Sequence, residues 1–378
     1  MIGRIASILL ALLALACSAQ TGAPIAPVVA SAPVIVPEER LRPPILHGPP
    51  KNVILVIGDG VGIAHVTAAR MLRAGEFRMG TMPVAGLVST ASADSIITDS
   101  AAAATAMATG VKADNRAISV DPEGVAHRTV LELAEQRGKS TGLLTTTGFW
   151  DATPAAFAAH VKDRGEAHEI GMQMLDQGIE IIASTGVEVF GVDDVPPLEQ
   201  VAASAGYELA SSLEEIDRSG DRPVLAIFPS QPNDLDAAEA PLPLLAEAAL
   251  RKLASDPDGF FLMIEHEGTD TASHYHANDD VIRSLHSLDE AVGVALAFAS
   301  RDGNTLVLVT GDHETGGLSL LSTPDGSLVL NWSTGGHSAA LIPLFAYGPG
   351  AEAFSGVYEN TEIGRRLLAI VSSGAGVR

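Results

Sequence analysis

The chain has 378 residues, of which 47% are hydrophobic and only 4% are aromatic. This length and apolar content suffice for one large α/β domain or two modest ones, and they exclude a wholly disordered chain. The formal net charge of −23 gives a surface that repels nucleic acid, so binding to DNA or RNA is not expected. A small anionic substrate remains compatible with this charge, because bound divalent cations would invert the local field.

Residues 1–19 have the features of an export signal. Arg4 precedes an apolar stretch that is too short to cross a bilayer and is followed by small residues suited to cleavage. Cys17, the only cysteine, lies where a bacterial lipoprotein would be acylated, although Ala14 stands where a larger aliphatic residue is usual. We expect an exported protein, either free in the periplasm or outside the cell, or anchored to the outer membrane by a lipid on Cys17.

Residues 20–50 form a Pro- and Ala-rich linker with little charge before Glu38, a composition typical of an extended spacer. The sequence shows no convincing second core after this linker, so we predict one domain over residues 51–378. The region 186–222 is less regular and is interpreted as an insertion.

Within that domain, short apolar runs alternate with amphipathic stretches. The runs predict β-strands at 53–57, 141–145, 224–228, 260–264, 305–309 and 341–347. The amphipathic stretches predict helices at 64–73, 129–137, 244–254 and 279–299. This alternation predicts an α/β fold with a mostly parallel sheet.

Acidic and histidine residues stand at the carboxyl ends of three apolar runs. They are Asp59; Glu265, with Asp270 and His274 just beyond; and Asp312 with His313. Ligands of parallel sheets bind outside the carboxyl ends of the strands, so these groups can converge on one crevice. Each residue alone could be an ordinary surface acid or histidine, but their recurrence at one structural place indicates bound divalent metal.

Ser100 begins a run of small residues that ends at Gly110 and predicts a helix. A helix N-terminus favours an anion, so a serine there is placed to attack phosphorus. The local sequence by itself favours the simpler role of Ser100 as a helix cap. No histidine stands beside Ser100 in the sequence as a base, so its alkoxide would need a metal for activation.

Several blocks of the sequence resemble the motifs of alkaline phosphatases. The loop Gly58–Gly62 resembles the metal-binding loop, and Thr98–Ala102 resembles the nucleophile motif. The further blocks follow in family order at 151–156, 160–164, 265–274, 310–317 and 335–338. The resemblance implies a three-layer sandwich whose mostly parallel central sheet is flanked by helices. It also implies hydrolysis of small phosphate monoesters through a covalent phosphoserine, often in a homodimer.

The resemblance further implies roles for individual residues. Ser100 would be the nucleophile, and Arg164 would bind two phosphate oxygens. One Zn²⁺ would be held by Asp270, His274 and His337, and a second by Asp59, Asp312 and His313. One Mg²⁺ would be held by Asp59, Thr153 and Glu265, with Asp151 holding its waters. These sets are chemically consistent, because imidazole with carboxylate suits zinc and all-oxygen ligation suits magnesium.

Without the surrounding motifs, two of these residues have simpler interpretations. Arg164 would be a surface arginine beside Asp163, and His337 would be a turn residue.

Three features depart from the family pattern. Glu265 is followed by His266 and Glu267 where a glycine commonly follows the acid, so Glu267 competes with Glu265 for the magnesium. Thr271 stands where many relatives carry Lys, His or Trp, which leaves the tuning of the phosphate site open. His266 and His276 have no role in the family, and we expect them at solvated loop positions.

Other functions fit the sequence less well than a phosphomonoesterase. Arg164 disfavours a phosphodiesterase or sulfatase of the same superfamily, because a monoester most freely supplies the two non-bridging oxygens that it would bind. Export disfavours a phosphate-carrier mutase. The intact nucleophile and ligands disfavour a non-catalytic metal- or phosphate-binding protein, and an adhesion or structural protein has only the Pro-rich linker in its favour.

Overall fold

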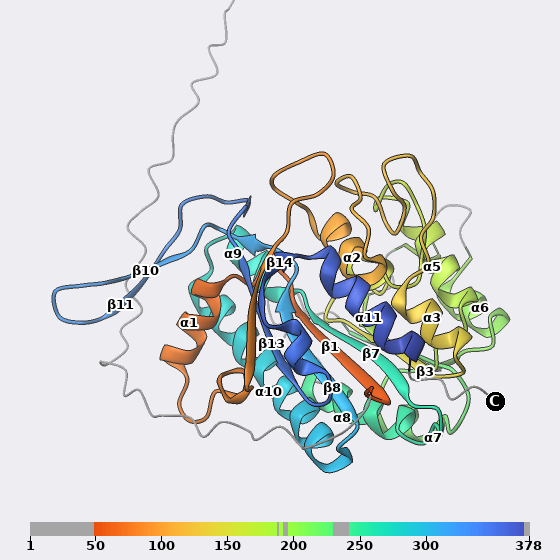
Figure 1. Cartoon of the computed structure of the whole chain (residues 1–378). Coiled ribbons are helices and arrows are strands. Elements are labelled where there is room, and N and C mark those ends of the chain that lie inside the picture. Colours follow the sequence, from red (N-terminus) through yellow and green to blue (C-terminus); the bar gives the residue numbers. More distant parts are fainter. Residues whose placement is uncertain (1–48, 187–188, 192–195, 230–241, 374–378) are drawn as a thin grey trace, which may run out of the picture.

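A ten-stranded sheet forms the centre of the protein (Figure 1). The computed structural model describes residues 49–186, 189–191, 196–229 and 242–373. In spatial order, the strands are β14 (Gly356–Glu359), β2 (Val84–Ser89), β13 (Ile342–Tyr347), β8 (Thr305–Gly311), β1 (Asn52–Gly58), β7 (Phe260–His266), β3 (Ser140–Leu144), β4 (Ile181–Thr185), β6 (Val224–Phe228) and β5 (Glu208–Ala210). Neighbouring strands are parallel except that β13 runs antiparallel to both β2 and β8.

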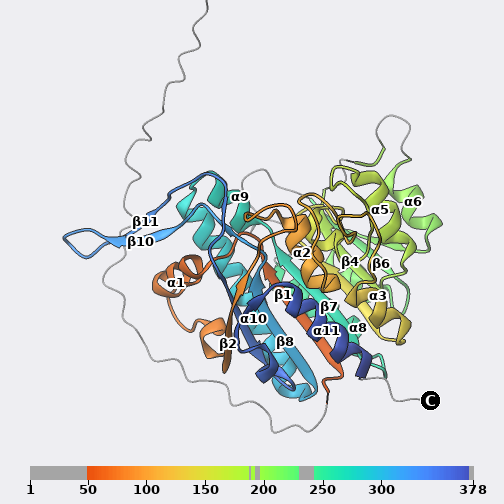
Figure 2. The ribbon, with the colours of Figure 1, turned by 45° about the horizontal axis from the view of Figure 1, so that its top comes forward.

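Helices cover both faces of this sheet (Figures 1 and 2). One face packs against α1 (Ile63–Leu72), α8 (Leu242–Leu253) and α10 (Asn278–Asp302). The other packs against α2 (Ser100–Thr109), α3 (Val130–Gln136) and α11 (Thr361–Ser373). The predicted three-layer α/β sandwich with a mostly parallel sheet is therefore confirmed.

Shorter elements surround these layers. They are α4 (Ala152–Ala155), α5 (Ala167–Asp176), α6 (Leu198–Ser204), α7 (Leu213–Arg218), α9 (Gly268–His274), the 3₁₀ helices η1 (Arg78–Thr81) and η2 (Ala351–Phe354), and the short strands β9 (Glu314–Thr315), β10 (Ser319–Ser322), β11 (Leu328–Asn331) and β12 (His337–Ser338). The β10–β11 hairpin projects from the body of the molecule in both views (Figures 1 and 2). No helix in the described part of the chain is long and apolar enough to cross a membrane.

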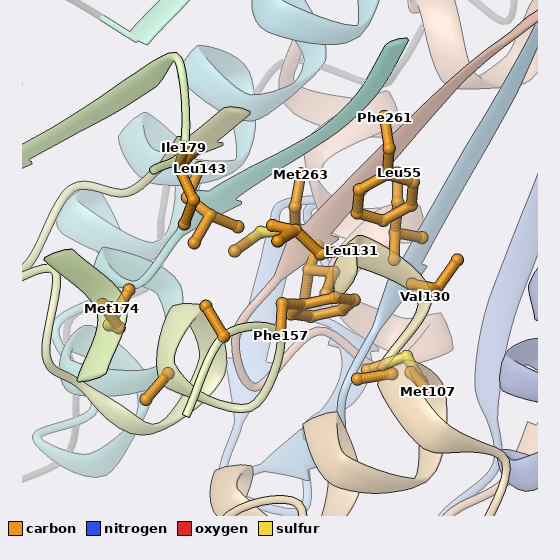
Figure 3. Packing of buried hydrophobic residues seen from close by; sticks show 14 of the residues in the cluster. Leu55, Met107, Val130, Leu131, Leu143, Phe157, Met174, Ile179, Phe261 and Met263 are labelled. Atoms are coloured by element: carbon orange, nitrogen blue, oxygen red, sulfur yellow. The ribbon is translucent and has the colours of Figure 1, made fainter. Parts of the chain in front are cut away.

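The central strand β1 is apolar throughout because both of its faces are buried. Val53, Leu55 and Ile57 pack into the core on the side of α2 and α3, whereas Ile54 and Val56 pack into the core on the side of α8 and α10. Figure 3 shows Leu55 beside side chains from β7 and α3 in the first of these cores. Burying each such aliphatic side chain contributes roughly 1.5–3 kcal/mol, so these strands supply a rigid base for the residues that follow them.

All six predicted strands and all four predicted helices are present, with ends shifted by a few residues. The region 186–222, interpreted as an insertion, contributes β5, which pairs with β6 at one edge of the main sheet; that interpretation stays a prediction. The predicted export signal, Cys17 and residues 20–48 of the linker lie outside the described residues.

The register of the three middle strands determines where the functional residues lie. Gly58 of β1 is opposite both His266 of β7 and Gly311 of β8. The residues that end or follow these strands therefore emerge side by side at the carboxyl edge of the sheet. This placement agrees with the convergence expected from the sequence.

A pair of partly buried acids lies at the opposite, amino edge of the sheet. The Thr141 hydroxyl donates a hydrogen bond to Glu135, and the Thr141 backbone N–H donates to Glu180 Oε2 at 2.6 Å. Burial raises the pKa of Glu135 to about 7, and the charge of Glu180 adds to the increase against the opposing hydrogen bond from Thr141. Burial likewise raises the pKa of Glu180.

These acids should make stability depend on pH. Because the pKa of Glu135 is about 7 when folded and 4.5 in its ordinary state, the folded chain binds this proton more tightly. Its contribution to the free energy of unfolding therefore declines as pH rises from about 4.5 to about 7. At pH 8, Glu135→Gln should be about 1–2 kcal/mol more stable than wild type by urea unfolding, with the gain disappearing near pH 4.5. Glu199→Gln, at an exposed site on α6, is the control; an equal gain there would contradict the assignment.

Candidate active site and metal centre

The first group of candidate ligands follows β1 and β8. Asp59 and Asp312 are buried, as is His313, whose Nε2 lies 3.5 Å from Asp59 Oδ1 and 3.2 Å from Asp312 Oδ2. The Gly60 N–H donates to Asp312 Oδ1 at 3.0 Å, which joins the two strand ends. Gly60 has φ +73°, and a Cβ there would lie 2.9 Å from Asp270, so this turn requires glycine.

The second group comes from α9 and β12. Asp270 and His274 are one helical turn apart, and His274 Nε2 lies 3.1 Å from Asp270 Oδ2. Pairing of β12 with β9 brings His337 to the same place, with its Nε2 3.7 Å from Asp270 Oδ1. Nitrogen and oxygen atoms of Asp270, His274 and His337 all lie within 4.8 Å of one another, as do those of Asp59, Asp270 and His313. Each set can therefore surround one metal ion.

The three histidines all direct Nε2 toward this centre. Nδ1 of His274 donates to the Gly335 carbonyl at 2.7 Å, and Nδ1 of His337 donates to the Thr98 carbonyl at 2.8 Å. Nδ1 of His313 lies 3.3 Å from Thr315 Oγ1, whose own hydrogen is donated to Asp270. Hydrogen bonding at Nδ1 leaves the Nε2 lone pair available, which is the arrangement found for metal-binding histidines.

Ser100 is the first residue of α2 and is directed into the cluster. Its Oγ lies 3.2 Å from His313 Nε2. The cap of α2 is Asp99, whose Oδ1 accepts the Ala102 N–H at 3.0 Å. The interpretation of Ser100 as a simple cap is therefore wrong, because its hydroxyl contacts His313, and Asp99 caps the helix.

Arg164 is partly buried between two carboxylates. Its Nη2 donates to Asp151 Oδ1 at 2.8 Å, and its Nη1 lies 3.5 Å from Asp99 Oδ2. Asp163 pairs with Arg116 instead, through contacts of 2.7 and 3.0 Å, so the interpretation of Arg164 as a surface partner of Asp163 is wrong. The sequence prediction overlooked Asp99 as a site residue, although an acid directly before a helix-starting serine is a typical cap signal.

Oxygen ligands gather between β7 and α4. Thr153 and Glu265 are fully buried, and Glu265 Oε2 accepts a hydrogen bond from Thr145 at 2.5 Å. The competing Glu267 is half-buried, and its carboxylate accepts a hydrogen bond from the Thr271 hydroxyl. Asp151 caps α4 by accepting the Ala152 N–H at 2.8 Å.

Burial and mutual repulsion shift the pKa values of these groups. Burial raises the pKa of Asp59 well above its ordinary value, and the charges of Asp312, Asp270 and Glu265 raise it further. Burial also raises the pKa of Asp312 to about 7. The pKa of His313 is lowered to about 4 by burial, so its imidazole is neutral and able to bind a cation.

A second, independent observation indicates that these donor atoms suit metal ions. Buried side-chain atoms normally have hydrogen-bond partners. Among the described residues, four oxygens of the predicted ligands are buried without one: Asp59 Oδ1, Thr153 Oγ1, Glu265 Oε1 and Asp312 Oδ2. Unpartnered carboxylate oxygens in a cluster of negative charge are the environment that a divalent cation would complete.

The expectation of a solvated loop position is wrong for His266, whereas His276 does lie in the turn between α9 and α10. β7 continues two residues beyond its predicted end, and His266 is fully buried on the face opposite Glu265. Burial lowers the pKa of His266 to about 4, and neither of its ring nitrogens has a partner in the described structure. His276 is half-buried and stacks on Trp332.

Comparisons with known proteins identify the family of this chain. The alkaline phosphatase family model matches residues 50–195 and 200–330. Alkaline phosphatase 3 of Bacillus subtilis is 30% identical, over 84% of this chain and 88% of its own. Alkaline phosphatase H of Pseudomonas aeruginosa is 32% identical over 83% of each chain.

Solved structures show the same relationship. The alkaline phosphatase from the Antarctic bacterium TAB5 superposes with a TM-score of 0.81 at 32% identity, over 86% of this chain and 98% of its own. A variant of the TAB5 enzyme has Mg bound in its M3 site and superposes with a TM-score of 0.79. On the evidence of fold, motifs and relatives, the chain belongs to the alkaline phosphatase family and is a metal-dependent enzyme that hydrolyses phosphate monoesters.

Proposed function

We propose that this enzyme cleaves phosphate monoesters through a covalent phosphoserine on Ser100, at a site that holds two Zn²⁺ and one Mg²⁺. The observation that carries the proposal is the position of Ser100. Its Oγ lies at a helix N-terminus, 3.2 Å from His313 Nε2, within a cluster of potential metal ligands. A serine placed in this way has both a binding site for an anion and a means of activation.

The ligand sets are those that the family resemblance implies, and the chemistry of the donors is consistent with them. Asp270, His274 and His337 would hold the first zinc, and Asp59, Asp312 and His313 would hold the second. Asp59, Thr153 and Glu265 would hold the magnesium, with Asp151 holding its waters. Bound zinc would lower the pKa of the Ser100 hydroxyl and offset the charge that develops on the departing oxygen.

Arg164 and the start of α2 would bind the phosphate. The guanidinium presents two parallel N–H groups that match two phosphate oxygens, and Asp151 and Asp99 hold it in place. The free backbone N–H groups of α2 add a second source of positive potential. Both act most strongly on the equatorial oxygens as charge accumulates in the transition state.

The reaction has two displacement steps. Ser100 Oγ attacks phosphorus in line, the bond from phosphorus to the ester oxygen breaks, and the alcohol leaves after taking up a proton. Water then attacks the phosphoserine, which restores the Ser100 hydroxyl and releases inorganic phosphate. The same Arg164 contacts serve both steps, because the equatorial oxygens do not leave.

The proposal includes export, on the basis of the N-terminal sequence. A lipid anchor at Cys17 and a homodimer stay predictions.

Replacing the nucleophile tests the phosphoserine. Ser100→Ala should form no phosphoenzyme and should lose at least about 1000-fold in kcat, because no other hydroxyl takes its place. Rapid quenching with a ³²P-labelled aryl phosphate would measure the labelled protein directly. Ser355→Ala, at an exposed site, is the control, and equal zinc content in both variants would show that the centre is loaded. Full turnover by Ser100→Ala would refute the assignment.

Replacing Arg164 tests whether this residue makes the enzyme prefer monoesters to diesters. Arg164→Ala should reduce kcat/KM for an aryl phosphate by about 100-fold, since it removes two charge-assisted hydrogen bonds. The loss on an aryl phosphodiester should be clearly smaller, because a diester offers fewer free oxygens. Arg251→Ala, which breaks exposed pairs with Asp217 and Glu247, is the control. Equal losses on both substrates would contradict this role.

The two competing glutamates can be separated by metal content. Glu265→Gln should lose the magnesium after dialysis at low Mg²⁺, because it removes the charge of a buried oxygen without a hydrogen-bond partner. Glu267→Gln should retain it, since its carboxylate already accepts a hydrogen bond from Thr271. Elemental analysis would measure both, with retained zinc as evidence of an intact site. The reverse result would transfer the role to Glu267.

A further inference from the structure

We propose that His276 and Trp332 form a clamp that positions the ligands of the first zinc. This inference rests on the proposed zinc assignment and adds two positioning residues to it. The clamp consists of His276, Trp332 and the loop 333–336 that they hold.

His337 needs such support because of where it lies. The other predicted zinc ligands follow strands of the main sheet or lie on α9. His337 instead belongs to β12, a strand of two residues, and follows a loop in which Ser333, Thr334 and Gly335 are exposed. Few buried apolar contacts are available to fix a segment of this kind.

Two histidines of the segment 274–276 are bonded to this loop. His274 Nδ1 donates to the Gly335 carbonyl at 2.7 Å, and His276 Nε2 lies 2.9 Å from the Thr334 carbonyl, to which it donates. These bonds connect the segment that carries His274 to the segment that carries His337. The separation between two ligands of the same metal is therefore set by neighbouring hydrogen bonds.

Trp332 lies against every segment that contributes zinc ligands. Its ring stacks on His276 with centroids 5.3 Å apart and an angle of 5° between the planes, and its Nε1 donates to Asn278 Oδ1 at 2.9 Å. A Cβ at Gly316 would lie 2.3 Å from the Trp332 ring, so the segment that carries His313 is in close contact with it. His65, on the helix after Asp59, lies 5.7 Å away from Trp332 between ring centroids.

The backbone of His276 supports the same conclusion. His276 has φ +55°, in the left-handed region that residues with side chains rarely adopt. Such a conformation persists where surrounding contacts impose it. Backbone hydrogen bonds from the His276 N–H to Ser273 and from the Ala277 N–H to Ala272 close the end of α9 with His276 in this conformation, and its imidazole then meets Trp332 and the Thr334 carbonyl.

The consequence is retention of the first zinc. Loss of groups that orient metal ligands typically weakens metal binding about 10- to 100-fold. Without the clamp, the loop that carries His337 can move away from His274 while the strands that carry Asp59 and Asp312 stay in place. One of the two zincs should then leave faster, and the other should be unaffected.

The test compares zinc release from loaded His276→Gly and wild-type enzyme into a chromophoric chelator. The clamp predicts two phases of zinc release, of which one becomes about tenfold faster in His276→Gly. The accelerated phase should be the one that is absent in His337→Ala. Glycine adopts this φ without strain. If His276 has only a structural role, the zinc-free His276→Gly protein should therefore keep or gain thermal stability, and its zinc release should be unchanged. His276→Asn, which tolerates this φ and retains an N–H donor, should be intermediate.

The matched control is His286→Asn. His286 also makes one hydrogen bond through Nε2 to a carbonyl, that of Ala69 at 3.0 Å, but it lies on α10 away from the cluster. Its release phases should equal those of wild type. Release from His276→Gly within twofold of wild type, or equal acceleration in the control, would overturn the clamp alone. Wild-type enzyme that holds no zinc after loading would overturn the proposed metal assignment as well.

Fluorescence gives a second readout that does not depend on activity. The chain has two tryptophans, so a Trp150→Phe background reports Trp332 alone. Adding zinc to the metal-free protein should shift Trp332 emission in this background, and His276→Gly should abolish the shift. An identical shift in both proteins would show that the stack is not coupled to the metal.

Discussion

Repulsion among buried carboxylates is the constraint on which the rest of this site depends. Asp59, Asp312 and Glu265 end adjacent parallel strands, and Asp270 approaches them from α9. Burial raises the pKa values of the first three, and the charges of neighbouring carboxylates raise them further, which means that the ionised forms are destabilised in the metal-free chain. Cations would offset this cost, so metal binding and stability of the fold are coupled at the alkaline pH where carboxylates are ionised.

The sequence predicted this convergence because both of its causes are local. An apolar run such as 53–57 shows a strand buried on both faces, and the polar residue that ends the run shows which edge it faces. Parallel register then brings Asp59, Glu265 and Asp312 together without further information. The local sequence does not indicate that His337 joins Asp270 and His274. That prediction came from the resemblance to alkaline phosphatases.

The mispredicted features depend on tertiary contacts. His266 belongs to a strand whose last two residues are polar, so the hydrophobic pattern ends before the strand does. The strand β5 has three residues and is recognisable only through its pairing with β6. Asp99 has two functions, as the cap of α2 and as a neighbour of Arg164, and only the first has a local signal. Asp99 and Arg164 are 65 residues apart in the sequence, so only the folded structure shows that they are neighbours.

The site therefore combines two kinds of support. Strand ends fixed by a close-packed core position Asp59, Asp312 and Glu265, and these need no further restraint. His337 lies on a surface loop and depends on hydrogen bonds and stacking from α9, α10 and Trp332. The free energy of local opening is lowest where few apolar contacts are buried. The loop that carries His337 should therefore open before the strand ends that carry Asp59, Asp312 and Glu265. In the proposed assignment, the zinc held by Asp270, His274 and His337 would then be the one that exchanges first.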